Sequence, residues 1–324
     1  MRAPNYFEYR NGISQALSPL AGLYVAIAKL RHRWTQPWQA TVPVICVGNI
    51  TTGGAGKTPV ALALGKVLRK QAHKIHFLSR GYGGRLRGPI RVDRERHKAQ
   101  DVGDEPLLLA EVAPTWIARN RVSGAKAAIA AGASIIVMDD GLQNPTLAKT
   151  LSFVVVDGVA GFGNCRVLPA GPLRQPIDDG LAQADAIILI EPVLSNVATE
   201  LDRAAKPIIR ARMVPTMAAQ EFAGRDVVAF AGIGRPEKFF TTLEEIGCQI
   251  LNKHAFPDHH TFTPEEVMQL VESARAANAT PITTTKDFAR LPPDAQLMVE
   301  PFPVLLEWRN PKDIEPLLDR ALHI

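Results

Sequence analysis

Hydrophobic residues along the middle of the chain fall into short runs separated by polar or amphipathic stretches. The runs are seven to nine residues long and rich in Val and Ile; they lie at residues 44–50, 74–80, 133–140, 151–158 and 184–192. Helical stretches such as the one from Lys57 to about Gln71 separate them. This alternation predicts an α/β fold with a mainly parallel sheet covered by helices.

The alternation repeats on a smaller scale after residue 215. Two apolar runs at 226–234 and 248–256 flank a helix expected from Pro236 to Ile246, and a further helix from Pro264 precedes the run at 280–287. The segment PIIRARMVP between the two blocks is interpreted as a connector. We therefore expect a core domain at residues 41–215 and a smaller α/β domain at 216–324.

Residues 13–30 are mostly apolar and end in a basic-aromatic flank: Lys29, Arg31, Arg33, Trp34 and Trp38. Eighteen helical residues reach about 27 Å, short of a bilayer core of about 30 Å, and Pro19 weakens a spanning helix further. No A-x-A cleavage site follows. We predict that residues 1–40 form a membrane-interface helix with its flank, with a packed core helix as the alternative.

Charge and cysteine content narrow the classes of partner. Of the net charge of +5 on 324 residues, most comes from the first forty residues, and the remainder of the chain is nearly neutral. A broad nucleic-acid surface is therefore not expected. The three cysteines, Cys46, Cys165 and Cys248, have neither disulfide-framework nor metal-ligand spacing, which fits a reducing compartment.

The stretch GNITTGGAGKTP joins an apolar strand to a helix, the context of a phosphate-binding loop. Thr51 stands where the first glycine of G-x-x-x-x-G-K-[ST] is expected. Phosphate binding needs backbone N–H groups that point inward and residues that adopt left-handed conformations. Gly53, Gly54 and Gly56 can supply these without a glycine at position 51. Lys57 would reach the β- and γ-phosphates, and Thr58 would bind magnesium. The other predicted nucleotide-binding residues are Thr51, Thr52, Gly53, Gly54, Ala55 and Gly56.

Asp139 and Asp140 end the apolar run SIIVMDDG, so both carboxylates are expected at the carboxyl edge of the sheet beside the phosphate loop. A phosphate-loop enzyme needs such carboxylates to hold hydrated magnesium. The alternative for Asp140 is that it only caps the following turn.

VGDEP places Asp104 and Glu105 before Pro106 at an apparent helix start. Asp104 fits a helix cap as well as it fits a carboxylate that orients or deprotonates an acceptor hydroxyl. Positive charge for a transferring phosphoryl group could come from arginines, each of which is equally compatible with a structural role. The candidates are Arg80, Arg121 and Arg174.

FPDHHTF supplies Asp258, His259 and His260 from the smaller domain. No further ligand at suitable spacing accompanies the histidines, so a metal site is not favoured. His259 after Asp258 suits an imidazole oriented by a carboxylate and acting near the chemistry. A loop histidine with no role is the alternative.

These motifs together resemble the tetraacyldisaccharide 4'-kinases of lipid A biosynthesis. The matching signatures span roughly residues 43–287: GNITTGGAGKTP, SRGYGG, VGDEP, MDDGLQ, GFGNCRVLPAGPLR, AGIGRPEKFF, FPDHHTF and TTTKD. Thr51 is a normal variant in that family. Leu142, where the family often has an aromatic residue, is a small departure.

The resemblance implies a kinase at the cytoplasmic face of the inner membrane, peripheral or monotopic. It would use ATP and Mg²⁺ to phosphorylate the 4'-hydroxyl of tetraacyldisaccharide 1-phosphate, forming lipid IVA. It implies Asp104 as catalytic base, His259 as the residue that tunes it, and Asp139 and Asp140 as the magnesium pair, with Gln143 just beyond them. The expected partners are the lipid substrate and the membrane surface, with no nucleic acid and no obligate protein partner evident.

Two other classes of function remain open from the residues alone. One is a GTPase or ATPase that acts as a switch or metal-insertion chaperone, although Thr285-Lys286-Asp287 lacks the intervening residue of an N/T-K-x-D guanine motif. The other is a membrane-surface assembly protein that binds nucleotide only structurally. Transfer of phosphate to a lipid distinguishes the kinase from both.

Overall fold

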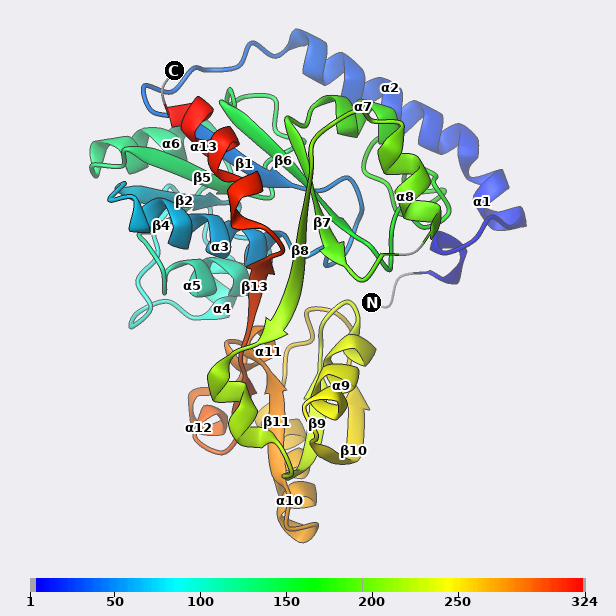
Figure 1. Cartoon of the computed structure of the whole chain (residues 1–324), viewed down its shortest axis with the longest axis vertical. Coiled ribbons are helices and arrows are strands. Elements are labelled where there is room, and N and C mark those ends of the chain that lie inside the picture. Colours follow the sequence, from blue (N-terminus) through cyan, green and yellow to red (C-terminus); the bar gives the residue numbers. More distant parts are fainter. Residues whose placement is uncertain (1–3, 194, 323–324) are drawn as a thin grey trace.

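The computed structural model describes residues 4–193 and 195–322, which form a large and a small α/β body joined by two strands (Figure 1). The large body contains a nine-stranded sheet with the order β13-β8-β7-β6-β1-β5-β2-β4-β3. Its pairs are parallel except β3 with β4 and β13 with β8. The strands are β1 (Val44–Gly48), β2 (Ile75–Ser79), β3 (Ile90–Arg91), β4 (Thr115–Ile117), β5 (Ile135–Asp139), β6 (Leu151–Asp157), β7 (Ala186–Glu191), β8 (Ile208–Pro215) and β13 (Val304–Trp308). The predicted fold class is confirmed.

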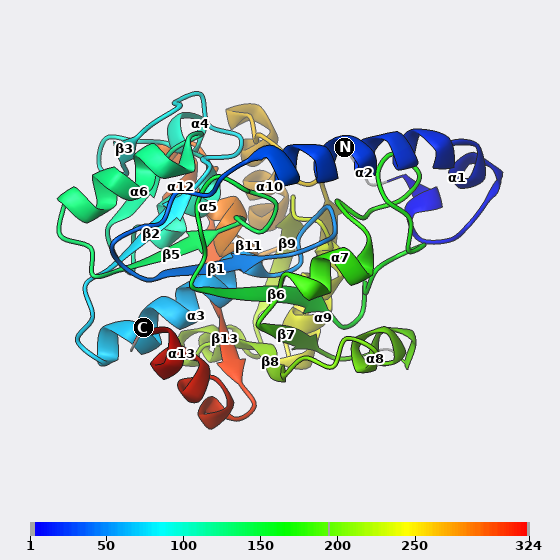
Figure 2. The ribbon, with the colours of Figure 1, turned by 90° about the horizontal axis from the view of Figure 1, so that it is seen from above.

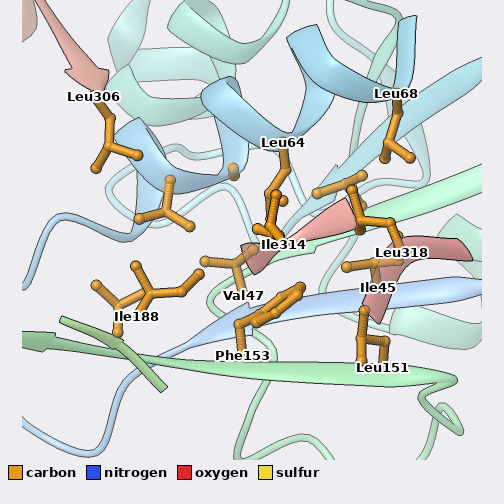
Figure 3. Close-up of a cluster of buried hydrophobic side chains, with 14 of the residues drawn as sticks. Ile45, Val47, Leu64, Leu68, Leu151, Phe153, Ile188, Leu306, Ile314 and Leu318 are labelled. Atoms are coloured by element: carbon orange, nitrogen blue, oxygen red, sulfur yellow. The ribbon is translucent and has the colours of Figure 1, made fainter. Parts of the chain in front are cut away.

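Helices cover both faces of the large sheet (Figure 2). On one face α3 (Lys57–Lys70) and α13 (Glu315–Leu322) bury a cluster that includes Val47, Leu64, Phe153 and Leu318 (Figure 3). The other face is covered by α2 (Ser18–Trp34), α6 (Arg121–Ala130) and α7 (Ile177–Ala182). Every residue of β1, β2, β5 and β6 is buried, as a sheet covered on both faces requires. The remaining large-body helices are η1 (Asn5–Phe7), α1 (Gly12–Ala16), α4 (Ala99–Val102), α5 (Asp104–Leu109), α8 (Ser195–Asp202) and η3 (Pro311–Asp313).

The small body has an all-parallel sheet in the order β10-β9-β11-β12. Phe240 and Leu243 pack on one face of it, and Phe230 and Val267 pack on the other. Its elements are η2 (Met217–Phe222), β9 (Asp226–Ala231), α9 (Pro236–Glu245), β10 (Gln249–Ala255), α10 (Pro264–Ala276), β11 (Thr280–Thr284), α11 (Thr285–Phe288), α12 (Pro293–Gln296) and β12 (Glu300–Phe302).

The end of the chain departs from the expected division at 216–324. After β12 the chain returns to the large body, where β13 pairs with β8 and α13 packs into the main core. The small body therefore comprises residues 216–303. The segment PIIRARMVP is also a strand, β8, rather than a connector. Both differences have the same cause. Strand β8 pairs with β7 on one side, but its neighbour on the other side is β13, which lies almost ninety positions later in the chain.

The N-terminal segment forms α1 and α2 along the surface of the large body (Figures 1 and 2). Ala21 is buried against that body, whereas a row of large apolar side chains faces outward: Leu20, Leu23, Tyr24, Ile27, Leu30 and Trp34. The alternative of a packed core helix is wrong, because a core helix would bury this row. Among the described residues, helices of the length and hydrophobicity needed to cross a membrane are absent.

Candidate active site

The phosphate loop lies between β1, at the middle of the large sheet, and α3. Gly56 caps α3 with φ of 86°, and Gly53 has φ of 96°, conformations that L side chains rarely adopt. A Cβ on Gly56 would also lie 2.4 Å from Ile190 Cδ1. Thr51 instead forms an isolated antiparallel bridge with Leu173. A glycine is therefore not required at position 51, which explains the threonine there.

The two side chains that begin α3 point to the carboxyl edge of the sheet. Lys57 Nζ donates to Asn49 Oδ1 at 3.2 Å and lies 3.8 Å from Asp140 Oδ1. Thr58 Oγ1 donates to Asp139 Oδ2 at 3.0 Å. Burial lowers the pKa of Lys57, even though Asp140 opposes that shift. The predicted phosphate-loop pair and the aspartate pair thus lie together in the structure.

Asp139 has the chemistry of an incomplete cation site. Burial, reinforced by the negative charge of Glu105, raises the pKa of Asp139 to about 7. Its Oδ1 is buried and has no hydrogen-bond partner among the described residues. An oxygen that is removed from water and lacks a donor is destabilised unless a ligand satisfies it. Asp139, Asp140 and Thr58 fit the oxygen ligands that Mg²⁺ prefers.

Arg174 and Gln143 complete this half of the site. Arg174 Nη1 donates to Asp140 Oδ1 at 2.8 Å and lies 3.5 Å from Gln143 Oε1. Gln143 Nε2 donates to the carbonyl oxygen of Asn49 at 2.8 Å. Burial raises the pKa of Asp140, but Lys57 and Arg174 outweigh it and the net shift is downward. Asp140 is therefore held as a carboxylate and does more than cap a turn.

The remaining two candidate arginines have different surroundings. Arg121, at the start of α6, is buried and donates to the Ala118 carbonyl at 2.6 Å, while its Nε has no partner among the described atoms. Burial, and after it the charge of Arg80, lower the pKa of Arg121 to about 10. Arg80 itself is exposed at the end of β2. The charges of Arg80 and of the aspartate pair thus both act on Arg121.

Asp104 lies at the first position of α5, with Gly103 as the N-cap and without a capping hydrogen bond from a side chain. Its buried carboxylate faces the small body instead. Arg290 donates to Asp104 Oδ2 through Nε at 2.8 Å and also through Nη2. Lys286 Nζ and His259 Nδ1 each lie 3.6 Å from the same oxygen. The capping interpretation is therefore wrong for the Asp104 side chain.

The ionised form of Asp104 is strongly favoured in this cluster. Burial alone would raise the pKa of Asp104, but the neighbouring His259 and the charges of Lys286 and Arg290 outweigh it and hold that pKa well below its ordinary range. Lys286 also lies 3.0 Å from Glu105 Oε1. Asp104, Glu105 and His259 offer ligand atoms within 4.8 Å of one another, but Lys286 and Arg290 already supply the positive charge a cation would bring.

The histidine pair separates into two roles. His259, with φ of 59°, lies beside Asp104, and its Nε2 is 3.9 Å from Asp258 Oδ1. His260 Nε2 is 3.0 Å from Glu266 Oε2 at the beginning of α10. His259 therefore faces the candidate site and His260 belongs to the local structure of the helix start.

Sequence reasoning missed several residues of the site. Lys286 lies within TTTKD and Arg290 follows it; in the sequence this motif indicates an imperfect guanine signature and a family match, but no site residue. In the loop after β9, Arg235 forms an ion pair with Asp157 of the large body. A Cβ on the neighbouring Gly234 would lie 3.5 Å from the backbone nitrogen of Gly54. The small body thus reaches the phosphate loop, a contact that no local pattern reveals.

Comparison with known proteins identifies the family of the chain. The family model "Tetraacyldisaccharide-1-P 4'-kinase" (LpxK) matches residues 13–323. A tetraacyldisaccharide 4'-kinase of Rhodospirillum centenum is 51% identical, covering 98% of this chain and 96% of the relative. The corresponding protein of Rhodospirillum rubrum is 48% identical, covering 99% and 98%.

A solved structure shows the same fold. The "apo" form of LpxK from Aquifex aeolicus in complex with ATP aligns with a TM-score of 0.75 at 24% identity, covering 96% of this chain and 99% of the other. Since the family model and both relatives match nearly the whole chain, this protein belongs to the tetraacyldisaccharide-1-P 4'-kinase family.

Proposed function

We propose that this protein transfers the γ-phosphoryl group of ATP to the 4'-hydroxyl of tetraacyldisaccharide 1-phosphate and so forms lipid IVA. One observation carries the proposal: a phosphate loop and the buried carboxylate of Asp104 lie in adjoining clusters where the two bodies meet. Glu105 links the clusters, because its charge acts on Lys57 and Asp139 while its side chain pairs with Lys286. The arrangement suits transfer to an acceptor better than a nucleotide switch.

The transfer assigns a task to each cluster. The acceptor oxygen forms a bond to the γ-phosphorus, the bond from that phosphorus to the β–γ bridging oxygen breaks, and ADP leaves. Loop N–H groups, Lys57 and Arg174 hold the phosphates and stabilise their charge. Asp104 orients the hydroxyl and receives its proton. Since its pKa is low, Asp104 is a weak base and accepts the proton late, once the oxygen is bonding to phosphorus.

Thr58, Asp139 and Asp140 would hold Mg²⁺, and Asp139 Oδ1, which has no partner within the described part of the chain, supports this assignment. The ion would neutralise charge on the phosphate oxygens during transfer. Asp139 is favoured as a ligand because burial destabilises its charge until a cation is present.

We further propose that α2 docks the protein on the cytoplasmic face of the inner membrane. Its outward row of apolar side chains ends beside Arg31 and Arg33, an order that suits insertion among anionic lipids, whereas Lys29 pairs with Asp179 at 2.7 Å. A tetraacylated acceptor stays in the bilayer because each CH₂ exposed to water costs about 0.8 kcal/mol. The enzyme therefore has to reach the acceptor at the membrane surface.

A direct assay tests the kinase. The purified protein is incubated with γ-labelled ATP, magnesium and detergent-dispersed tetraacyldisaccharide 1-phosphate, and we expect the label in the lipid. ATP hydrolysis at the same rate with and without the lipid, and an unlabelled lipid, would identify a switch or structural ATPase instead.

The membrane contact is tested by placing charges in the apolar row. Leu23→Glu combined with Ile27→Glu should reduce sedimentation with anionic vesicles by more than about tenfold, since burying each side chain contributes about 1.5–3 kcal/mol. Leu297→Glu, at a leucine 88% exposed on the small body, is the matched control. Equal sedimentation of both variants would move the membrane contact to another surface.

A further inference from the structure

Arg290 is the residue through which the small body contacts Asp104 most closely. Its side chain is 7% exposed, and each of its three nitrogens has a partner. Nη1 donates to the Gly232 carbonyl and to Asp287 Oδ1, both at 2.9 Å. Nε donates to Asp104 Oδ2, and Nη2 reaches both that oxygen and His259 Nδ1. One guanidinium thus joins two loops of the small body to the large body.

The anchor of Arg290 is built entirely within the small body. Asp287 is fully buried and its Oδ2 accepts from the Gly232 backbone at 3.0 Å and from Thr284 Oγ1 at 2.7 Å. Its other oxygen accepts from Arg290. Because the planar guanidinium presents its donors in a fixed fork, holding Nη1 also sets the direction of Nε and Nη2. The donors directed at Asp104 are therefore preoriented.

The same guanidinium selects a tautomer of His259. A guanidinium only donates, so its contact of 3.3 Å requires a lone pair on His259 Nδ1. The imidazole proton then resides on Nε2, on the side of Asp258. His259 is further held by its own backbone N–H, which donates to the Gly232 carbonyl at 3.0 Å. Asp104 and His259 are thus both positioned by Arg290.

The other charges around Asp104 are less directional. The groups that face its carboxylate are His259, Lys286 and Arg290, with Glu105 beside it in the chain. Lys286 is 3.6 Å from Asp104 and closer to Glu105, whereas Arg290 makes the hydrogen bonds. We propose that Arg290 is a positioning residue for phosphoryl transfer, which reaches from the small body and aims the ionised Asp104 of the large body at the acceptor. The inference rests on the proposed kinase function.

Replacement of Arg290 tests the proposal in the full-length protein. Arg290→Met should lower kcat about tenfold to a hundredfold and leave the KM for ATP within about twofold, because only the acceptor side loses its geometry. The midpoint of the acid limb of the kcat–pH profile should move to a pH higher by about one unit or more. The pKa of Asp104 rises because its burial remains while a cationic donor is lost. Arg290→Lys, which keeps the charge but lacks the fork, should restore the position of the acid limb but only part of kcat. Arg275→Gln, at an exposed arginine of α10, should match wild type.

Two outcomes separate positioning from a purely structural role. If Arg290→Met keeps the wild-type pH profile and loses kcat, ATP affinity and thermal stability together, the proposal is overturned. Should that variant fail to fold, Asp287→Asn keeps the guanidinium but loosens its anchor, and we expect a smaller shift of the limb in the same direction. An unchanged profile in a folded Asp287→Asn protein would also overturn it.

A measurement that needs no turnover separates this inference from the kinase proposal. In ¹⁵N–¹H correlation spectra of wild type, His259 should carry its proton on Nε2, and Arg290→Met should change that pattern. A wild-type protein with the proton on Nδ1 contradicts the role of Arg290, even if it phosphorylates lipid. An Nε2 tautomer without lipid phosphorylation would retain the Arg290 contact and reject the kinase function.

Discussion

The proposed nucleotide half of the site, around the phosphate loop, and the proposed acceptor half, around Asp104, are built in opposite ways. Lys57, Thr58, Asp139 and Asp140 come from ends of neighbouring strands and the adjoining helix of one sheet. Asp104 instead obtains its partners from the other body, through Arg290, Lys286 and His259. The first half needs only the large body to exist, whereas the second half forms only when the two bodies meet.

The two halves also differ in what controls the pKa values of their ionisable groups. In the nucleotide half, burial lowers the pKa of Lys57 and raises that of Asp139, so both charged forms are poorly satisfied without a ligand. In the acceptor half, ion pairs outweigh burial, so the pKa of Asp104 falls and that of Lys286 rises. The charged forms of Lys57 and Asp139 therefore await a ligand of opposite charge. The charge of Asp104 is instead already balanced by cationic side chains of the protein.

Removing the phosphate-loop lysine should give the largest effect and leave the Asp104 cluster intact. Lys57→Met should lower kcat/KM for ATP about 10²–10³-fold, because a buried cation directed at the transferring group is lost. Lys66→Met, at an exposed position of the same helix, is the control. Steady-state kinetics measures both variants. A Lys57→Met protein within tenfold of wild type would contradict the assignment of this half.

Neutralising Asp104, the proposed base, should affect the acceptor half alone. Asp104→Asn should lower kcat about 10²-fold, while ATP affinity stays within about twofold. Calorimetric titration of ATP and turnover assays measure the two quantities separately. Weakened ATP binding of the same size as the loss of turnover would show that the halves are not independent.

The same variant has a predictable acid response. The native pKa of Asp104 lies below its ordinary value of 3.8, so its contribution to stability is present above that value and is lost as pH falls through the native pKa. Wild type should therefore lose more stability than Asp104→Asn below about pH 4 to 5. Acid unfolding followed by circular dichroism measures this, and parallel curves would contradict it.

The smallest effect should come from the contact that holds the small body near the phosphate loop. Arg235→Gln removes the ion pair with Asp157 that holds the loop after β9 near the phosphate loop. We expect a loss of about threefold to tenfold in kcat/KM, because the arginine is partly solvated and its charge is screened. Arg225→Gln, which removes a surface pair within the small body, serves as control. Equal kinetics for the two variants would show that other contacts position this loop.

The nucleotide half was readable from the sequence because its residues follow strands within short local motifs. An apolar run before GGAGKT, and another before Asp139, is enough to place both at one sheet edge. The alternating pattern likewise predicted the long central strands. In both cases local periodicity and the parallel topology carry the information.

The acceptor half was only partly readable, because its geometry depends on tertiary contacts. Asp104 and His259 were named, but Arg290 has no motif of its own and becomes important only where the bodies approach each other. Strand β13 was missed for a related reason. It has five residues and pairs only with a strand far away in the chain, and such long-range pairing has no local signature.

The position of the small body within the β8–β13 pair has a consequence for the order of folding. Pro215 pairs with Val304, and the Thr216 backbone N–H donates to the Pro303 carbonyl at 3.0 Å, so the inserted segment begins and ends at neighbouring points. A flexible loop of that length would have to lose entropy before β13 could join the sheet. If residues 216–303 fold first, they bring their own ends together. Only the short distance between the two ends of the folded insertion then separates β13 from β8. The folded small body would thus lower the entropy lost when β13 joins the large sheet.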